Sequence, residues 1–268
     1  MSDVREALTT VMRAARDVAV AARPTRIDVK AALDYVTDVD RRLDEVLTER
    51  LSALTPGVPV LSEERPIEES GDTFWIIDPI DGTHNMMTGL PFFGVCAALF
   101  DGGGARVSAV LDVVRGAVYS AERGRGAFLD ETRLVMPETA STLVGVSSGA
   151  LDALLAEGEI YATLRKLGKL RNLGSQALHL ACVADGRFGF TLSHEARFWD
   201  DAAARLVAEE AGARYRSFAF PAEAAPIEVA RSKAPLKSLC AHPDLFDRLE
   251  PLVERLWPGP SAVIPSSR

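Results

Sequence analysis

The chain has 268 residues, of which 47% are hydrophobic and 25% charged, a composition typical of a globular protein that buries a large core. Its 38 acidic and 30 basic residues give a formal net charge of -8, which excludes duplex nucleic acid and anionic membranes as expected partners. The three cysteines are scattered, and no segment reaches about 18 uncharged apolar residues. The N-terminus lacks the unbroken apolar stretch of a signal peptide, so we expect a cytoplasmic protein.

Two amphipathic helices are predicted at the start of the chain. Apolar residues recur at helical spacing from Val4 to Ala22, and Pro24 ends the pattern. A second helix should begin after Thr37, whose side chain can cap it, and its apolar stripe continues to Leu51.

Runs of β-branched and aromatic residues predict strands in the following segment. Residues 58–61 and 74–77 are such runs, and the second leads into a turn. Four more runs, separated by glycine-containing turns, have the pattern of an antiparallel meander: residues 93–100, 106–114, 117–121 and 126–129.

After Pro137, strands and helices alternate. Residues 143–147, 170–173 and 187–192 are strand-like, and residues 151–167, 175–184 and 200–211 are helical, which is an α/β pattern. We place a boundary near residue 136. Residues 1–136 then form a half of helices plus antiparallel sheet with most of the candidate metal ligands. Residues 137–268 form an α/β half that closes the active site, and the two halves make one catalytic unit.

The segment Asp78-Pro79-Ile80-Asp81-Gly82-Thr83 carries the strongest chemical signal. A strand delivers Asp78 to a tight turn, and Asp81 returns to the same side. Two crowded carboxylates repel unless a cation separates them, and carboxylate and carbonyl oxygens, the latter from Ile80, are ligands for a hard metal. The Gly82 and Thr83 amides, at a helix start, suit phosphate oxygens. The alternative is an ordinary turn in which Asp81 only caps a helix.

Two further acidic segments favour the metal interpretation. Ser62-Glu63-Glu64 follows a predicted strand, and Trp199-Asp200-Asp201 stands at a predicted helix start. A single acid in such a place is usually a solvated cap, whereas three at strand ends indicate a shared carboxylate cluster.

Together these motifs resemble the inositol monophosphatase family of Mg²⁺-dependent, lithium-sensitive sugar-phosphate phosphatases. The resemblance spans residues 30–212 and also includes Val36-Thr37-Asp38-Val39-Asp40, His84-Asn85 and Gly174-Ser175. It implies a layered αβαβα sandwich, a mixed α+β and α/β fold of the inositol monophosphatase and fructose-1,6-bisphosphatase type. It also implies a homodimer and two or three Mg²⁺ ions per site.

The resemblance assigns a role to each motif residue. Glu63, Asp78 and the Ile80 carbonyl would hold the first Mg²⁺, and Asp78, Asp81 and Asp200 would hold the second. Glu63 and Thr83 would orient a water activated by the metal, with Asp40 supporting Thr83. The residues implied to contact the substrate are Asp81, Gly82, Thr83, Gly174, Ser175 and Asp200. Lys30 would lie near a third, weaker metal site.

One departure from the family concerns the substrate. Ser193 stands where animal-type members carry a glutamate that contacts inositol hydroxyls, and the nearest acid is Glu195. We therefore expect only a modest preference for inositol phosphates, with Arg197 as a contact for the leaving group. The alternatives are that Glu195 replaces the missing carboxylate, or that Arg197 faces solvent.

The expected function is hydrolysis of a small phosphorylated metabolite, inositol monophosphate or a similar polyol phosphate. Alternatives in the same class are histidinol-phosphate phosphatase, 3'-phosphoadenosine 5'-phosphate phosphatase and fructose-1,6-bisphosphatase. The alternative from another class is a catalytically silent protein that binds metal or anions on the same fold.

Overall fold

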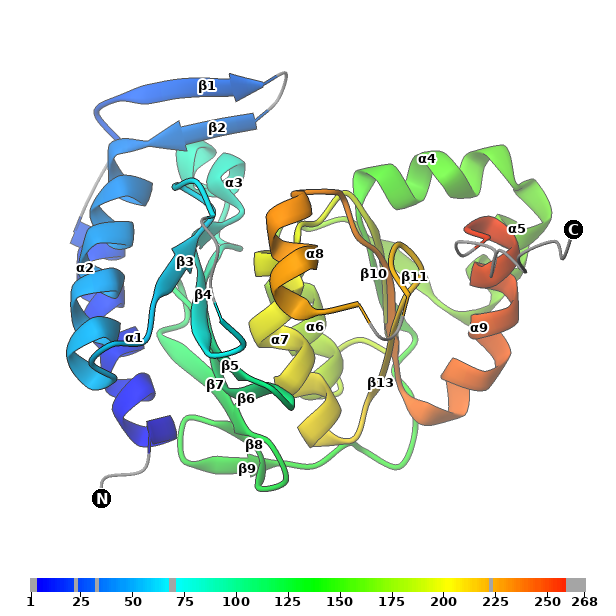
Figure 1. Ribbon diagram of the computed structural model, residues 1–268. Helices are drawn as coiled ribbons and strands as arrows, with labels where there is room; N and C mark the ends of the chain where they lie inside the picture. Colours follow the sequence, from blue (N-terminus) through cyan, green and yellow to red (C-terminus); the bar gives the residue numbers. More distant parts are fainter. Residues whose placement is uncertain (1–3, 22–23, 32–33, 68–70, 222–223, 259–268) are drawn as a thin grey trace, which may run out of the picture.

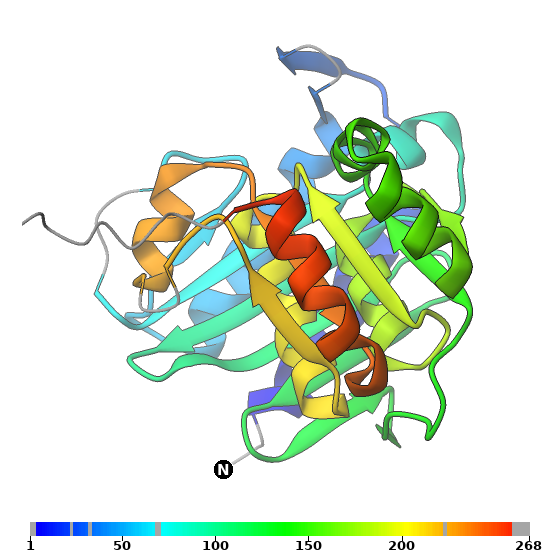
Figure 2. The same ribbon diagram turned by 90° about the vertical axis from the view of Figure 1, so that its right-hand side faces the viewer.

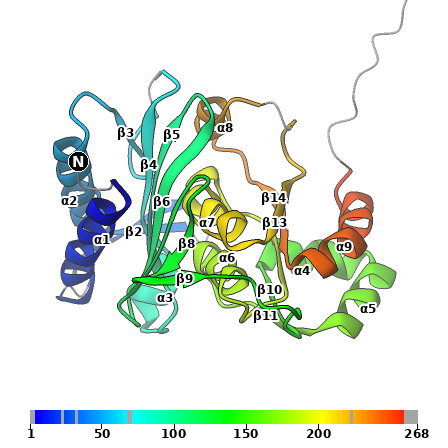
Figure 3. The same cartoon turned by 90° about the horizontal axis from the view of Figure 1, so that it is seen from below.

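Helices and sheets stack in five layers, helix, sheet, helix, sheet, helix (Figures 1 and 3). The computed structural model describes residues 4–21, 24–31, 34–67, 71–221 and 224–258, without the side chains of residues 30, 31 and 34. The expected αβαβα sandwich is confirmed. None of the helices in these ranges combines the length and apolarity that crossing a membrane requires.

The first layer consists of helices α1 (Val4–Ala21) and α2 (Asp38–Leu54), both predicted from their apolar spacing. Their buried stripes, which include Leu8 and Leu43, pack against one face of the first sheet. Thr37 caps α2 as expected, because its side chain accepts hydrogen bonds from two backbone N–H groups, and Asp40 accepts one from Thr37 N in return. Just before α2, strands β1 (Ile27–Ala31) and β2 (Asp34–Thr37) form a separate antiparallel pair that the sequence did not predict.

The second layer is a seven-stranded sheet in which strand order follows chain order from β3 to β9. The first pair is parallel and all others are antiparallel, which confirms the predicted meander. Its strands are β3 (Val60–Ser62), β4 (Phe74–Asp81), β5 (Gly94–Asp101), β6 (Gly104–Asp112), β7 (Ala117–Glu122), β8 (Gly126–Leu129) and β9 (Thr132–Leu134). The short, largely exposed β9 was not predicted.

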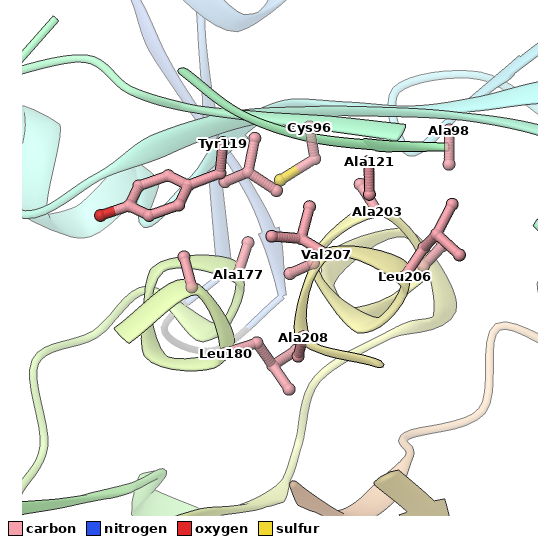
Figure 4. Packing of buried hydrophobic residues seen from close by; sticks show 14 of the residues in the cluster. Cys96, Ala98, Tyr119, Ala121, Ala177, Leu180, Ala203, Leu206, Val207 and Ala208 are labelled. Carbon is pink, nitrogen blue, oxygen red and sulfur yellow. The ribbon is translucent and has the colours of Figure 1, made fainter. Parts of the chain in front are cut away.

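Helices α6 (Gln176–Ala184) and α7 (Phe198–Ala211) form the middle layer, between the two sheets. Every residue of α6 is buried, because this helix has sheet or helix on all sides. Small side chains allow close approach: Figure 4 shows Ala177 of α6 and Ala203, Val207 and Ala208 of α7 packed beneath the first sheet. The short helix α8 (Pro226–Ser232) adds to this layer.

The fourth layer is a five-stranded sheet with the order β11-β10-β12-β14-β13. Strands β10 (Leu143–Val146), β11 (Lys169–Arg171) and β12 (Phe190–His194) are mutually parallel, so their carboxyl ends share one edge. Strand β14 (Lys237–Ala241) is antiparallel to both β12 and β13 (Arg214–Ser217). The outer helices α4 (Ser148–Ala156), α5 (Gly158–Leu167) and α9 (Pro243–Leu256) cover the far face (Figure 2).

Some predicted elements differ from the observed ones. The single helix expected over residues 151–167 is wrong: Glu157 has φ -118° and ψ 67°, outside the helical range, so the segment forms α4 and α5. The elements β13, β14, α8 and α9 were not predicted. The division near residue 136 stays a prediction, since α6 and α7 from the second half pack on the sheet of the first.

Candidate active site

Three carboxylates converge where the first sheet meets α7. Glu63 directly follows β3, Asp78 lies within β4, and Asp200 lies in the first turn of α7; one oxygen from each is within 4.8 Å of the others. The alternation of β4 explains this meeting. Phe74 and Ile76 face the cluster around α7, so Asp78, two residues further on, faces the same side.

Crowding and burial disturb the ionisation of this cluster. Burial raises the pKa of Asp78 well above its usual range, and the charges of Glu63, Asp200 and Asp81 raise it further. Burial also raises the pKa of Asp200 well above the usual value, with Asp81 and Glu63 adding to the effect. The site therefore disfavours several negative charges together unless a cation balances them.

The donor set fits a hard divalent cation. Each of the three groups offers a carboxylate oxygen, and no histidine or cysteine belongs to the cluster found among the described residues. Oxygen-only sets of this kind suit Mg²⁺ rather than zinc or copper.

An irregularity in β4 shapes the turn that follows Asp78. Asp78 pairs with Cys96 of β5, but Asp81 pairs with Gly94, so β4 has one extra residue between the two pairs. Pro79 has no N–H to offer a neighbouring strand, and Ile80 N instead donates to Asp78 Oδ1 at 3.0 Å. The bulge thereby brings both aspartates to the same region of the sheet.

Thr83 stands at the start of helix α3 (Thr83–Thr88), close to two oxygen atoms. Its Oγ1 lies 3.1 Å from Asp40 Oδ1 and 3.1 Å from the Ile80 carbonyl oxygen, and its single proton can serve one of them at a time. Burial raises the pKa of Asp40, while hydrogen bonds from Thr37 and Thr83 oppose the shift. Asp40 thus connects the cap of α2 to Thr83.

Asp81 accepts three hydrogen bonds from the beginning of α6. The donors are the Ser175 hydroxyl, Gln176 N at 3.2 Å and Ala177 N at 2.7 Å. Burial raises the pKa of Asp81 to about 6, and these donors limit the rise. The alternative that Asp81 merely caps the helix following its own turn is wrong, since α3 has no side-chain cap and Asp81 binds a distant helix.

A pocket of about 170 Å³ opens beside these residues. Four of its lining residues were predicted for the site: Asp81, Gly174, Ser175 and Asp200. It also contains Ser147, Asn172, Gln176, His179, Ser193, Glu195 and Ala196. Asp200 belongs both to the pocket lining and to the carboxylate cluster, so the cluster with Glu63 and Asp78 lies next to the pocket.

Ser147 and Asn172 were not predicted as site residues. Ser147 directly follows the observed strand β10 and Asn172 the observed strand β11, whereas the predicted strands 143–147 and 170–173 included both residues. Ligands in α/β folds bind outside the carboxyl ends of parallel strands, so these strand ends carried the signal that could have found them.

Two residues considered for the substrate behave differently from each other. Glu195 lines the pocket, whereas Arg197 is not among its lining residues and donates from Nη1 to the Lys233 carbonyl. The expected contact from Arg197 to the leaving group stays a prediction. The side chain of Lys30 is outside the described part of the chain.

Comparisons with known proteins agree with this geometry. The model of the inositol monophosphatase family matches residues 1–229. The chain belongs to this family. The inositol-1-monophosphatase SuhB of Mycobacterium tuberculosis is 35% identical over 235 residues, covering 82% of this chain and 81% of that protein. A Thermotoga maritima protein named fructose-1,6-bisphosphatase/inositol-1-monophosphatase is 33% identical over 185 residues, covering 69% and 72%.

A solved structure supports the same conclusion. The IMPase of Thermotoga maritima superposes with a TM-score of 0.78 at 26% identity, covering 93% of this chain and 96% of that one. The resemblance read from the motifs is confirmed, and the chain is a phosphoric monoester hydrolase of the inositol monophosphatase family, which is metal-dependent and acts on small phosphorylated substrates.

Proposed function

We propose that this phosphatase hydrolyses inositol monophosphate or a similar polyol phosphate with the help of Mg²⁺. The observation that carries the proposal is the cluster of Glu63, Asp78 and Asp200, whose oxygens lie within 4.8 Å of one another in a site where burial disfavours charge. A divalent cation removes this cost and leaves positive charge for a phosphate to bind.

The assignment of metal ligands is the one that the family resemblance implies. Glu63, Asp78 and the Ile80 carbonyl would hold one Mg²⁺, and Asp78, Asp81 and Asp200 would hold a second; the family resemblance implies two or three ions per site. When bound, Mg²⁺ neutralises phosphate charge and lowers the pKa of water.

Thr83 and Asp40 would position the attacking water. If the Ile80 carbonyl is engaged elsewhere, the Thr83 proton is donated to Asp40 Oδ1, which leaves Thr83 Oγ1 free to accept a hydrogen bond from the water. Glu63 would accept the second hydrogen bond of the water and so help to align it with phosphorus.

The phosphate would bind at the turn that contains Gly82 and Thr83, and the leaving group would lie in the pocket. The Gly82 and Thr83 amides, at the start of α3, would bind phosphate oxygens. Gly174, Ser175, Asp81 and Asp200 line the adjoining pocket, where the rest of the substrate would lie.

Two further expectations belong to this proposal. We expect a homodimer, as the family resemblance implies, and a cytoplasmic location, as the cysteine usage of the sequence favours. Light scattering measures the mass in solution, and cell fractionation locates the protein.

The experiment is phosphate release from inositol 1-phosphate with Mg²⁺ and with EDTA, for the wild type, Asp78→Asn and Asp152→Asn. Asp78→Asn should lose more than about a hundredfold in kcat/KM, because metal stabilisation contributes several kcal/mol to the transition state. Asp152 is an exposed acid on α4, so Asp152→Asn controls for loss of one negative charge. Circular dichroism verifies that both variants fold. Near-normal Mg²⁺-dependent turnover by folded Asp78→Asn, or full wild-type turnover in EDTA, would refute the metal assignment.

A further inference from the structure

The far wall of the pocket is built at the shared edge of three parallel strands. Ser147 follows β10, Asn172 follows β11, and Ser193 and Glu195 lie at the end of β12. The candidate metal ligands Asp81 and Asp200 come from other elements of the pocket, so the phosphate would lie on their side and the leaving group against these four residues. We therefore call the four residues the leaving-group wall. This name rests on the proposed function.

The pocket offers no positive side chain to a leaving group. Among the described residues that line it there is no lysine or arginine, and Glu195 contributes a negative charge. His179 is neutral as well, since its Nε2 accepts a hydrogen bond from Leu173 N at 3.2 Å. A second phosphate on the leaving group would therefore meet no cationic side chain among these described lining residues.

Glu195 also occupies the start of α4, whose first N–H groups could otherwise have bound a second phosphate. Its Oε1 accepts from Ser148 N at 2.9 Å and its Oε2 from Gly149 N at 3.1 Å, so the first N–H groups of α4 are used by a carboxylate. A Cβ on Gly149 would lie 2.2 Å from the His194 carbonyl oxygen, so glycine at this position allows α4 to start directly against the end of β12. The charge of Glu195 is thereby held at the wall rather than left to move in solvent.

Neutral hydrogen-bonding groups remain available in the same pocket. Ser193 Oγ and Gln176 Oε1 are buried and have no partner among the described residues. Buried polar atoms normally have partners, and a leaving group with hydroxyls can supply both donors and acceptors.

We propose that the leaving-group wall selects a hydroxylated alcohol that is uncharged or carries an ammonium group, and that Glu195 rejects leaving groups with a second phosphate. The enzyme would then act poorly on fructose 1,6-bisphosphate and 3'-phosphoadenosine 5'-phosphate, unlike a relative whose name includes fructose-1,6-bisphosphatase.

The test compares kcat/KM for three leaving-group classes with Mg²⁺ present. Inositol 1-phosphate and glycerol 2-phosphate have neutral leaving groups, histidinol phosphate has an ammonium, and the two compounds above have a second phosphate. We expect the wild type to prefer the first two classes by at least about tenfold, and the gap to narrow at high KCl, which screens charge at an exposed residue.

Glu195→Gln isolates the charge of Glu195. It should raise kcat/KM for the doubly phosphorylated substrates about tenfold, mainly through KM, and narrow their gap to glycerol 2-phosphate by about the same factor, since an amide oxygen keeps one bond to α4. Asp152→Asn, the matched loss of an acid on α4 away from the pocket, should change neither.

The outcomes separate this inference from the proposed function. If monoesters are hydrolysed but fructose 1,6-bisphosphate is as good a substrate as inositol 1-phosphate, only the inference fails. The same holds if Glu195→Gln and Asp152→Asn respond alike. If no monoester is hydrolysed with Mg²⁺, both fail. Should Glu195→Gln not fold, the wild-type substrate ratio and its salt dependence still decide.

Discussion

The hydroxyl of Ser175 donates a hydrogen bond to Oδ2 of Asp81, a residue 94 positions earlier in the chain. Asp81 ends β4 in the first sheet, whereas Ser175 caps α6 in the middle layer. The Ser175 side chain also accepts a hydrogen bond from Leu178 N. One hydroxyl therefore joins the acidic turn to the helix that borders the pocket.

Ser175→Ala should weaken both connections. The variant loses a hydrogen bond to a buried carboxylate and the cap of α6, so the free energy of unfolding should fall by about 2 kcal/mol. Urea unfolding monitored by circular dichroism measures the change. Ser175→Thr keeps a hydroxyl and should recover most of the loss. A Ser175→Ala variant as stable as the wild type would show that the contact contributes nothing.

Gly82→Ala should disturb both the turn that follows β4 and the loop around Gly174 that lies against it. Gly82 has φ +95°, and a Cβ there would lie 3.0 Å from the Gly174 carbonyl oxygen. We expect a loss of kcat/KM of about a hundredfold, because displacing the two loops misplaces the groups around the phosphate. Gly57→Ala is the matched control, since Gly57 has φ +85° but no atom within 4 Å of the added Cβ. That control should lose about 1 kcal/mol of stability and no activity. Equal activity of the two variants would contradict the prediction.

Thr83→Ala should lower kcat more than it raises KM. The hydroxyl is expected to orient water in the transition state rather than to bind substrate, so the loss in kcat should be about a hundredfold. Thr83→Ser retains the oxygen near Asp40 and should keep much of the rate. Steady-state kinetics on inositol 1-phosphate gives both constants. If serine and alanine are equally harmful, Thr83 serves packing instead.

His179 should make the protein sensitive to mild acid. Burial lowers the pKa of His179 to about 4, whereas in the unfolded chain it is about 6.5. The unfolded state therefore binds a proton first as the pH falls, and stability is lost between pH 6.5 and 4. From pH 7 to pH 5 the wild type should lose on the order of 2 kcal/mol more than His179→Gln, measured by urea unfolding. The exposed His84 provides the control, because His84→Gln should follow the wild type. Parallel pH profiles for wild type and His179→Gln would refute the assignment.

Much of the fold followed from local signals in the sequence. The apolar spacing before Ala22 predicted α1, Thr37 predicted the cap of α2, and glycine-containing turns predicted the meander. These signals are local because helix and strand periods and turn geometry depend on residues a few positions apart. The family was also recognisable from local signals, because each of its acidic motifs is a short run of neighbouring residues. The layered fold that this resemblance implied was confirmed with it.

Local signals were insufficient where neighbouring elements compete. The apolar pattern over residues 151–167 continues across Glu157, yet the backbone there leaves the helical range and α5 begins at Gly158. Strand β14 lies between β12 and β13 although it follows both in the chain, an order that no short window of sequence contains.

The sequence by itself determined which residues could form an acidic site and which elements would carry them. Only the tertiary structure decided which of them meet. It placed Asp81 against the start of α6 and Glu195 against the start of α4, and it left Arg197 outside the pocket. The reason is physical: such contacts join residues tens of positions apart, and they form only when sheet order and layer packing bring the elements together.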